Sequence, residues 1–501
     1  MKCRRFEIQR TLGVLFVSFF LIFQLNCASP TPQEQGRRVL EDAAEAMGGL
    51  EALRGIENIT RRGNRQSNSL GQARVTAERL LIGSPGAFTQ IIDFTVPREI
   101  NLSGEREIIT VADAVKGGYR DVQGRALRPL EPGQMEGYQK EWDRDIVKFL
   151  VHALGSESSI EGYESTEVDG QRVHVAEVRY IDGTLYKVTM GHGSDVISKL
   201  EFTEERNPYG DLEKERSFSN YLEIGGLTLP FTETTREMGE VTRMLEWTEI
   251  AINQDLPEER FEIPENELSI GERAQALVNA DTLPVEPTEL APGVYFGESV
   301  SMNNMWVEFD DFILVAEGPS HEMQSLEVIR QIRETVGDKP IRYLVTTHHH
   351  ADHTGGIRTY AGEGAIVVTH ANNEEIIREI LTRPHTLKPD LLAESGQEPQ
   401  IEAVEDRKTI TDGTRTVELL HVPNAHADGY LAIYLPRERL IFQSDMLSIL
   451  QGETGDPVLR PYTREFYDAV VKEGWRVDQI VPGHGRLAPW QELADALSKA
   501  E

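Results

Sequence analysis

The sequence predicts two domains, a mostly antiparallel β domain followed by an α/β sandwich. A chain of 501 residues is too long for one hydrophobic core, and about 150 residues per domain allows two or three. Residues 56–261 contain runs of β-branched and aromatic residues typical of strands, whereas strands alternate with helices after residue 289. Only three of the 13 histidines precede residue 265. Chemistry that needs imidazole is therefore expected in the second domain.

Residues 1–27 are typical of an export signal. Four basic residues precede an apolar run over 12–23, which is shorter than the roughly 20 residues that span a bilayer as a helix. Cys27 lies where a bacterial lipoprotein carries its lipidated cysteine, although the residues at 24–26 depart from the usual pattern. We expect an exported, periplasmic protein. Three fates of the segment stay open: a lipid anchor through Cys27 that holds the protein at the membrane, ordinary signal cleavage, or an uncleaved anchor.

The negative net charge of the chain argues against a nucleic-acid partner. Asp and Glu number 83 against 51 Lys and Arg, a net charge of −32 that repels phosphodiester backbones. We therefore expect no nucleic-acid partner. A small-molecule substrate is expected instead, and the sequence indicates no protein partner.

The first domain is predicted over residues 37–264, after a Ser/Pro/Gln-rich tether at 28–36. Apolar residues at helical spacing predict a helix over 36–53. Strand patterns follow at 75–82, 88–94, 173–180, 185–190, 227–231 and 241–250. Asp182-Gly183 predicts a tight hairpin, because both residues tolerate a positive φ. This domain is therefore predicted to be a mostly antiparallel sheet.

The second domain is predicted over residues 289–498. An acidic, Pro-containing stretch without periodicity, 265–288, is the predicted linker. Strands are predicted at 305–309, 312–316, 341–345, 365–369, 417–421, 430–435 and 439–443, and helices at 320–336 and 372–381. Strands that alternate with helices indicate an α/β sandwich.

A histidine-rich loop directly follows the predicted strand 341–345. It reads Thr-Thr-His-His-His-Ala-Asp-His-Thr-Gly-Gly over 346–356. In an extended loop His348 and His350 point the same way, because side chains alternate with period two, so they can bind one ion. Asp352 and His353 can serve a second ion nearby. A borderline ion such as Zn²⁺ suits imidazole and carboxylate ligands, and the body of the chain contains no cysteine.

These residues match the His-x-His-x-Asp-His loop of the metallo-β-lactamase superfamily position for position. Three later motifs resemble those of the family, in order: 423–429 with His426, 442–446 with Asp445, and 481–485 with His484. The resemblance covers about residues 289–495. It implies an αββα sandwich in which His348, His350 and His426 hold the first metal. Asp352, His353 and His484 hold the second, and Asp445 is shared.

The resemblance also implies the chemistry. Two divalent ions hold a water between them and lower its pKa towards 7, so that hydroxide attacks an ester, thioester or amide. Asp352 is the expected catalytic side chain, which orients the attack and passes a proton to the leaving group. Two zinc ions are expected, with iron or manganese left open. A β-lactamase is the alternative activity, although Asp445 disfavours the type with cysteine there.

The first domain resembles, in element order, the half-barrel of periplasmic lipoprotein carriers. A lipid- or lipoprotein-handling protein with a structural metal domain is therefore a further alternative. Residues 382–400 contain three prolines and predict an irregular lid near the site. His349 is expected to point away from the metals, and His321 and His385 to lie on the surface.

Overall fold

The computed structural model describes residues 29–96, 98–104, 106–111, 116–121, 128–129, 132–168, 170–191, 195–261, 283–299, 302–449 and 457–500. The expected signal segment, Cys27 and most of the expected linker lie outside these residues. Within them, no helix is both long and apolar enough to cross a membrane.

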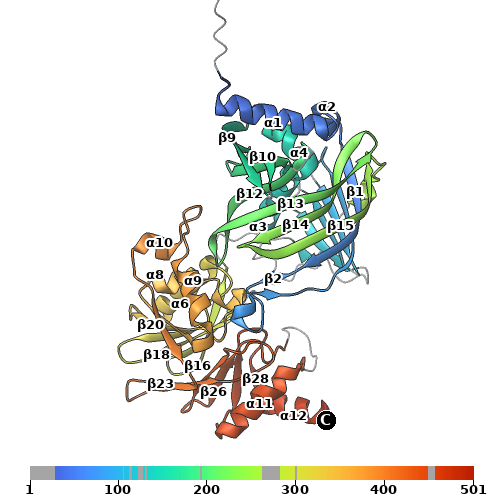
Figure 1. The fold of residues 1–501 in the computed structure, drawn as a ribbon. Helices are drawn as coiled ribbons and strands as arrows, with labels where there is room; N and C mark the ends of the chain where they lie inside the picture. The colour runs from blue at the N-terminus through green and yellow to red at the C-terminus, as the bar shows by residue number, and fades with distance from the viewer. Residues whose placement is uncertain are drawn as a thin grey trace, which may run out of the picture.

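The first domain is built on one antiparallel sheet of 13 strands (Figure 1). Its order is β8-β7-β6-β5-β4-β1-β15-β14-β13-β12-β11-β10-β9, so that β1 pairs with the distant β15. The strands are β1 Asn58–Ser67, β4 Gly86–Asp93, β5 Arg98–Ser103, β6 Arg106–Val111, β7 Lys116–Asp121, β8 Arg128–Pro129, β9 Ser159–Val168, β10 Gln171–Arg179, β11 Leu185–Gly191, β12 Ile197–Arg206, β13 Gly210–Ile224, β14 Leu227–Glu237 and β15 Glu240–Ile252.

Helices of the first domain pack against this sheet. They are α1 Pro32–Ala46, α2 Leu50–Arg54, α3 Pro132–Asp143, α4 Ile146–Ala153 and the short 3-10 helix η3 Glu258–Arg260. Leu40 of α1 and Phe149 of α4 join Tyr180, directly after β10, and Phe202 of β12 in one buried cluster. The aromatic side chains of these strands therefore form core.

Two predictions at the start of this domain need correction. The tether predicted to reach residue 36 ends earlier, because Thr31 caps α1 through a capping box with Glu34. A single helix was predicted over 36–53, but the structure has two. Gly48 and Gly49 adopt φ values of 113° and 94°, and this break separates α1 from α2. Helical spacing of apolar residues continues through this break and conceals it.

The strand predicted at 75–82 is also wrong. These residues form the 3-10 helix η1 Thr76–Glu78 and the two-residue strand β3 Leu80–Leu81, which pairs only with β2 Ser69–Leu70. They leave the large sheet after β1 and return to it at β4. In Figure 1 this blue excursion extends to the second domain.

The second domain contains two mixed sheets. The first has the order β16-β17-β18-β19-β20-β21-β22, in which β19 to β22 run parallel, and the second has the order β23-β24-β25-β26-β27-β28. The strands are β16 Val285–Ala291, β17 Val294–Ser299, β18 Asn304–Glu308, β19 Ile313–Ala316, β20 Ile341–Val345, β21 Ile366–His370, β22 Gln400–Val404, β23 Arg407–Thr411, β24 Thr416–His421, β25 Leu431–Leu435, β26 Leu440–Gln443, β27 Gln479–Pro482 and β28 Ala488–Pro489. Because β16 begins at Val285, the predicted linker 265–288 ends inside a strand.

Helices cover the outer face of each sheet, which gives four layers. The helices of this domain are α6 Glu322–Val336, α7 Ala351–Thr354, α8 Ile357–Gly362, η4 Ala371–Asn373, α9 Glu374–Thr382, α10 Leu391–Ser395, α11 Pro461–Glu473 and α12 Trp490–Ala500. Leu344 of β20 packs with α6, α8 and α9, whereas the next residue, Val345, packs between the two sheets with Phe442. Phe466 of α11 and Leu493 of α12 pack behind the second sheet.

The segment predicted as an irregular lid, 382–400, contacts the first domain at its start and contains the helix α10. Arg383 donates hydrogen bonds to the carbonyl oxygens of Tyr209 and Asp211, and the Asp211 carboxylate accepts from the backbone N–H groups of Thr386 and Leu387. His385, expected on the surface, is buried at this contact. The segment therefore joins the two domains.

Candidate metal centre

The seven predicted residues meet at one edge of the sandwich. His348 and His350 follow β20, Asp445 follows β26 and His484 follows β27. His426 lies in the turn between β24 and β25. Strand ends are rigid and the loops after them are exposed, so ligands gather there. Asp352 and His353 lie in the single helical turn α7, not in extended loop as the sequence suggested.

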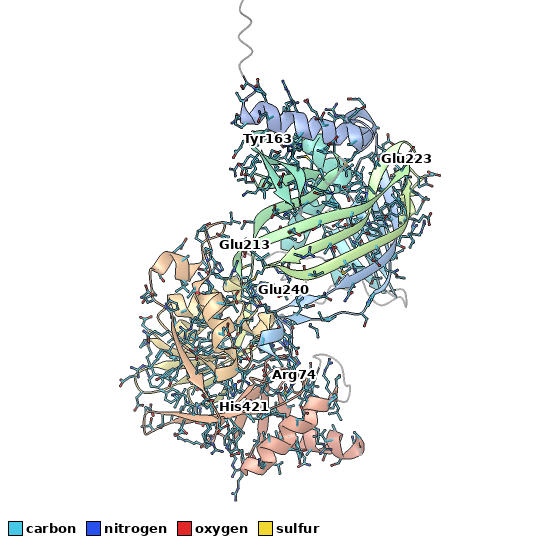
Figure 2. All side chains as sticks on the ribbon, in the orientation of Figure 1. Arg74, Tyr163, Glu213, Glu223, Glu240 and His421 are labelled. Carbon is cyan, nitrogen blue, oxygen red and sulfur yellow. The ribbon has the colours of Figure 1, made fainter. Side chains whose placement is uncertain are left out.

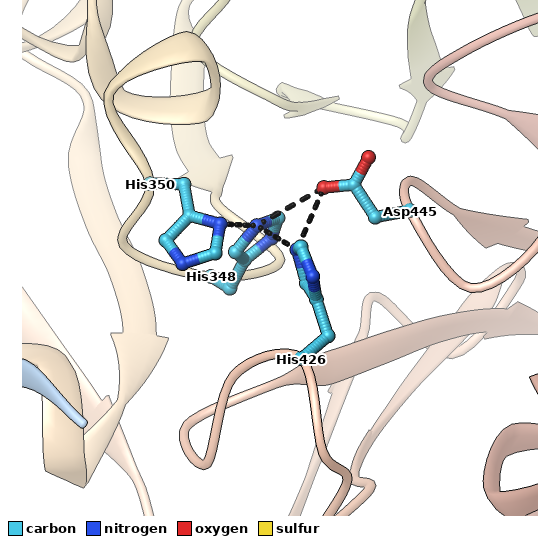
Figure 3. A group of neighbouring side chains, drawn as sticks. All are labelled: His348, His350, His426 and Asp445. Carbon is cyan, nitrogen blue, oxygen red and sulfur yellow. Dashed lines mark hydrogen bonds and ion pairs between the residues drawn. The ribbon is translucent and has the colours of Figure 1, made fainter. Parts of the chain in front are cut away.

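The first group contains His348, His350, His426 and Asp445 (Figure 3). The Nε2 atom of His348 lies 3.0 Å from Nδ1 of His350 and 3.1 Å from Nε2 of His426. An Asp445 oxygen lies 3.0 Å from Nε2 of His426 and 3.2 Å from Nε2 of His348. Three imidazoles and one carboxylate thus converge on one point.

The second group contains Asp352, His353 and His484. Nε2 of His353 and Nε2 of His484 lie 3.5 and 3.6 Å from an Asp352 oxygen. Asp445 reaches this group as well, at 2.9 Å from His353 and 3.4 Å from His484. Asp445 therefore contacts both groups.

The donor set fits a pair of divalent ions. Tetrahedral zinc with Zn–N distances of ~2.0–2.1 Å places its nitrogen ligands about 3.3 Å apart, close to the observed spacing in the first group. Nitrogen atoms whose lone pairs face one another at such distances are best satisfied by a cation between them. That these seven residues bind metal stays a prediction, which the geometry supports.

Burial and charge set the protonation states of the histidines at this site. Burial lowers the pKa of His350 to about 3 and that of His348 well below its usual value, which keeps both rings neutral. Burial alone would lower the pKa of His353, but the charges of Asp445, Glu317 and Asp352 outweigh it and raise this pKa well above the usual value. Without metal, His353 is therefore protonated and faces these carboxylates.

A third carboxylate, that of Glu317, contacts the second group through the ring nitrogen of His353 that faces away from Asp352 and Asp445. Glu317 is fully buried directly after β19, and its oxygen lies 3.5 Å from Nδ1 of His353. The same oxygen accepts a hydrogen bond from the Thr347 hydroxyl, which lies 3.0 Å from Nδ1 of His348. Sequence reasoning missed both residues. A charged residue directly after an apolar strand is the signal that could have indicated Glu317.

Two contacts to the site come from the first domain. The Ala73 carbonyl oxygen lies 3.2 Å from Nε2 of His350, and the Gln72 amide donates to an Asp352 oxygen at 3.4 Å. Nothing in the sequence indicates either contact, because they join positions 277 and 280 residues apart.

Other histidines remain outside both groups. His349 is buried and takes no part in either, as expected from its place between two ligands. His370 and His421 stack with ring centroids 3.8 Å apart, and His421 hydrogen-bonds to the Asp428 carbonyl oxygen. His321 is exposed, as expected, at the start of α6.

Known proteins are similar in sequence to this part of the chain. The model of the metallo-beta-lactamase superfamily matches residues 324–492, which include all seven residues. The linear primary-alkylsulfatase of Pseudomonas sp. (strain ATCC 19151) is 24% identical over 225 residues, 37% of this chain and 42% of that protein. The type 2 metallo-beta-lactamase of Bacillus cereus is 20% identical over 203 residues, 40% of this chain and 72% of that protein.

A similar solved structure, the metallo-beta-lactamase from Pontibacter korlensis, has 20% identity and a TM-score of 0.34 and covers 43% of this chain and 97% of its own. The matched part of the chain spans about two fifths of the length of the alkylsulfatase. The family match and the hydrolase relatives support a metal-dependent hydrolase. The second domain is therefore similar to the metallo-beta-lactamase superfamily over residues 324–492.

Proposed function

We propose that the protein is an exported binuclear metal-dependent hydrolase that cleaves an ester, thioester or amide bond of a small molecule. The observation that carries this proposal is the position of Asp445, whose carboxylate contacts ligand atoms of both groups. One carboxylate between two clusters of imidazoles is the arrangement that holds two cations close together.

Two ions bound there would supply an activated water and a Lewis acid for the scissile bond. Asp352 is the side chain suited to proton transfer. Burial alone would raise its pKa, but His353 and His484 lower it, so that Asp352 is a carboxylate at neutral pH. Its side chain is 41% exposed, whereas that of His353 is fully buried. Asp352 is therefore placed to orient the attacking water and to pass a proton to the leaving group.

The ligand types favour zinc over harder ions. The two groups offer five imidazoles and two carboxylates, a set suited to borderline cations. Iron and manganese also accept such ligands, so the metal is to be identified by mass spectrometry of the purified protein.

The experiment pairs metal content with a substrate panel. The panel contains carboxylic esters, thioesters and amides, a sulfate ester because of the alkylsulfatase relative, and a chromogenic β-lactam because of the Bacillus cereus relative. We expect two equivalents of metal per chain and hydrolysis that a chelator abolishes. Full activity on every substrate after metal removal would contradict the proposal.

Ligand variants test the two groups separately. His426→Ala should lower metal occupancy of the first group and His484→Ala that of the second, with activity reduced by more than about 100-fold, since even indirect partners of ligands contribute 10–100-fold. His174→Ala is the matched control, because this histidine lies in the first domain and bonds Tyr163. Both ligand variants retaining two equivalents of metal and full activity would rule out the assignment.

Export is a separate part of the proposal, based on the apolar run over 12–23 and on Cys27. Cell fractionation should find the protein outside the cytoplasm. Cys27→Ala should release it from the membrane fraction if the cysteine carries lipid, whereas unchanged fractionation favours ordinary cleavage or an uncleaved anchor.

A further inference from the structure

One hairpin of the first domain extends to the metal centre. We call residues 68–83 the docking segment; it contains β2, η1 and β3. Its base is closed by the pairs Ser69↔Leu81 and Leu70↔Leu80, so that residues 71–79 form the tip. In Figure 2 Arg74, at this tip, lies beside the second domain and far from Glu223 of the large sheet.

The docking segment is held on the second domain along its length. Leu70 and Leu80 are buried in the cluster that contains Tyr360 and Ile380. Polar contacts extend from this base to the tip, namely Arg79 with Glu379 at 2.8 Å, the Thr76 hydroxyl with the Asn372 carbonyl at 3.0 Å, and Arg74 Nε with the Asn424 carbonyl at 3.0 Å. A segment held by this many contacts has one defined position.

The tip places backbone and side-chain groups on both metal groups. His350 directs Nδ1 into the first group, so when Nδ1 binds metal the ring proton is on Nε2. Nε2 faces the Ala73 carbonyl at 3.2 Å, and Ala73 is 2% exposed. Gln72 donates to the Asp352 oxygen that does not face His353 and His484. Each contact fixes the orientation of a predicted ligand.

We propose that the docking segment is a working part of the metal centre. The Ala73 carbonyl acts as a positioning group for His350, and the Gln72 amide as one for Asp352. Hydrogen-bonding partners of metal ligands fix the tautomer and orientation of the ring. The second domain therefore reaches its full metal affinity only with the first domain docked, an inference that rests on the proposed metal-dependent function.

The coupling must also act in the opposite direction. If docking strengthens metal binding, metal binding stabilises the docked tip by the same free energy. Zinc should therefore slow hydrogen–deuterium exchange of peptides that cover residues 71–79 in the full-length wild-type protein. This measurement needs no substrate and no variant.

The sharpest variant removes the tip and keeps the base. Replacing residues 71–79 by Asn-Gly joins Leu70 to Leu80 through a two-residue hairpin turn and retains both buried leucines. The matched control replaces Gly225-Gly226, the turn between β13 and β14 of the same sheet, by Asn-Gly. Zinc affinity is measured by competition with a chromophoric chelator, and the ligand field by the visible absorption spectrum of the Co²⁺ form.

We expect the shortened variant to bind zinc about 10–100-fold more weakly and to shift the Co²⁺ spectrum, with the control unchanged. Gln72→Ala, which leaves the backbone intact, should weaken zinc binding in the group that contains Asp352. Unchanged affinity and spectrum in the shortened variant, or exchange at 71–79 that zinc does not alter, would overturn this inference alone. A wild-type protein that binds no zinc or Co²⁺ would overturn the proposed function together with it.

Discussion

At the scale of single residues, His353 has the most highly charged surroundings in the site. Its Nε2 atom lies 2.9 Å from Asp445, and its Nδ1 atom lies 3.5 Å from Glu317. When Nε2 binds a cation, Nδ1 carries the proton and faces a carboxylate, which makes the imidazole a stronger ligand. Glu317 is therefore expected to set the metal affinity of the second group.

We expect Glu317→Gln to weaken zinc binding in the second group by about 10–100-fold, because glutamine keeps a hydrogen-bond acceptor but loses the charge. Chelator competition measures the affinity. Glu308→Gln is the control, since that carboxylate pairs with Lys339 at 2.7 Å outside both groups. Equal affinities in the two variants would show that the charge of Glu317 has no such role.

In the first domain, Asp145 makes a pH-dependent contribution to the stability of the fold. It forms two hydrogen bonds with Arg61, at 2.6 and 2.7 Å, and caps α4 through the Val147 N–H. Burial alone would raise the pKa of Asp145, but the charge and hydrogen bonds of Arg61 lower it. A carboxyl group with a depressed folded-state pKa stabilises the protein above its unfolded pKa of about 3.9 and loses that contribution as the pH falls through the folded value.

Asp145→Asn should lower the free energy of unfolding by about 3–5 kcal/mol at pH 7, because buried Arg61 loses the carboxylate to which it is hydrogen-bonded. The difference from wild type should shrink as the pH falls below the unfolded pKa of about 3.9, and should vanish once the pH passes the lower folded value, where the wild-type carboxyl also loses its charge. Urea denaturation as a function of pH measures both effects. Asp42→Asn, on the exposed face of α1, should change little, and a gap that grows on acidification would disprove the account.

At the scale of elements, the docking segment depends on one glycine. Gly71 has φ 71°, and a Cβ atom there would lie 2.2 Å from the Tyr209 hydroxyl oxygen. Tyr209 is itself buried in the cluster that joins the two domains. Both the backbone conformation and the close approach therefore require glycine at the start of the tip.

We expect Gly71→Ala to destabilise the protein by at least about 1 kcal/mol more than Gly170→Ala, because both pay for a positive φ but only the first meets a neighbouring atom. Thermal unfolding compares the two. Adding Tyr209→Phe to Gly71→Ala should recover part of the loss by removing the hydroxyl. No recovery would locate the strain in the backbone alone.

The described elements of the first domain favour a scaffold over a lipid binder. Most of its buried apolar side chains pack into one core, and a cavity of 750 Å³ on the sheet is lined by both apolar side chains and charged groups, the charged ones including Glu164, Lys187, Lys199 and Glu201. Charged walls suit an acyl chain poorly. The resemblance to lipoprotein carriers stays a prediction.

At the scale of the whole molecule, the two domains share a hydrophobic cluster through Leu70, Leu80, Tyr209 and Leu212. We expect them to unfold as one unit in the described core. Zinc at 100 times its Kd should add about 2.7 kcal/mol per site to the free energy of unfolding of that unit. Calorimetry with and without chelator tests this. Two transitions, of which only one responds to zinc, would contradict it.

The sequence alone determined the elements and residues whose signals are local. The strand at 341–345 was predicted with the bounds that β20 has, because four of its five residues are apolar or aromatic and a polar loop follows them. The seven ligand candidates were found because four short motifs carry them, and the structure brings all seven together. The prediction of one helix over 36–53 was wrong, because helical spacing of apolar residues continues across Gly48-Gly49 although the chain changes direction there.

Only the tertiary structure decided what surrounds these ligands. The contact of Ala73 with His350 depends on a backbone carbonyl, which every residue possesses, so no choice of side chain indicates it. The docking of residues 68–83 and 382–400 likewise depends on surfaces that exist only after both domains have folded. The sequence shows which residue types can bind metal, whereas the positions of these side chains depend on packing between segments that are distant in the chain.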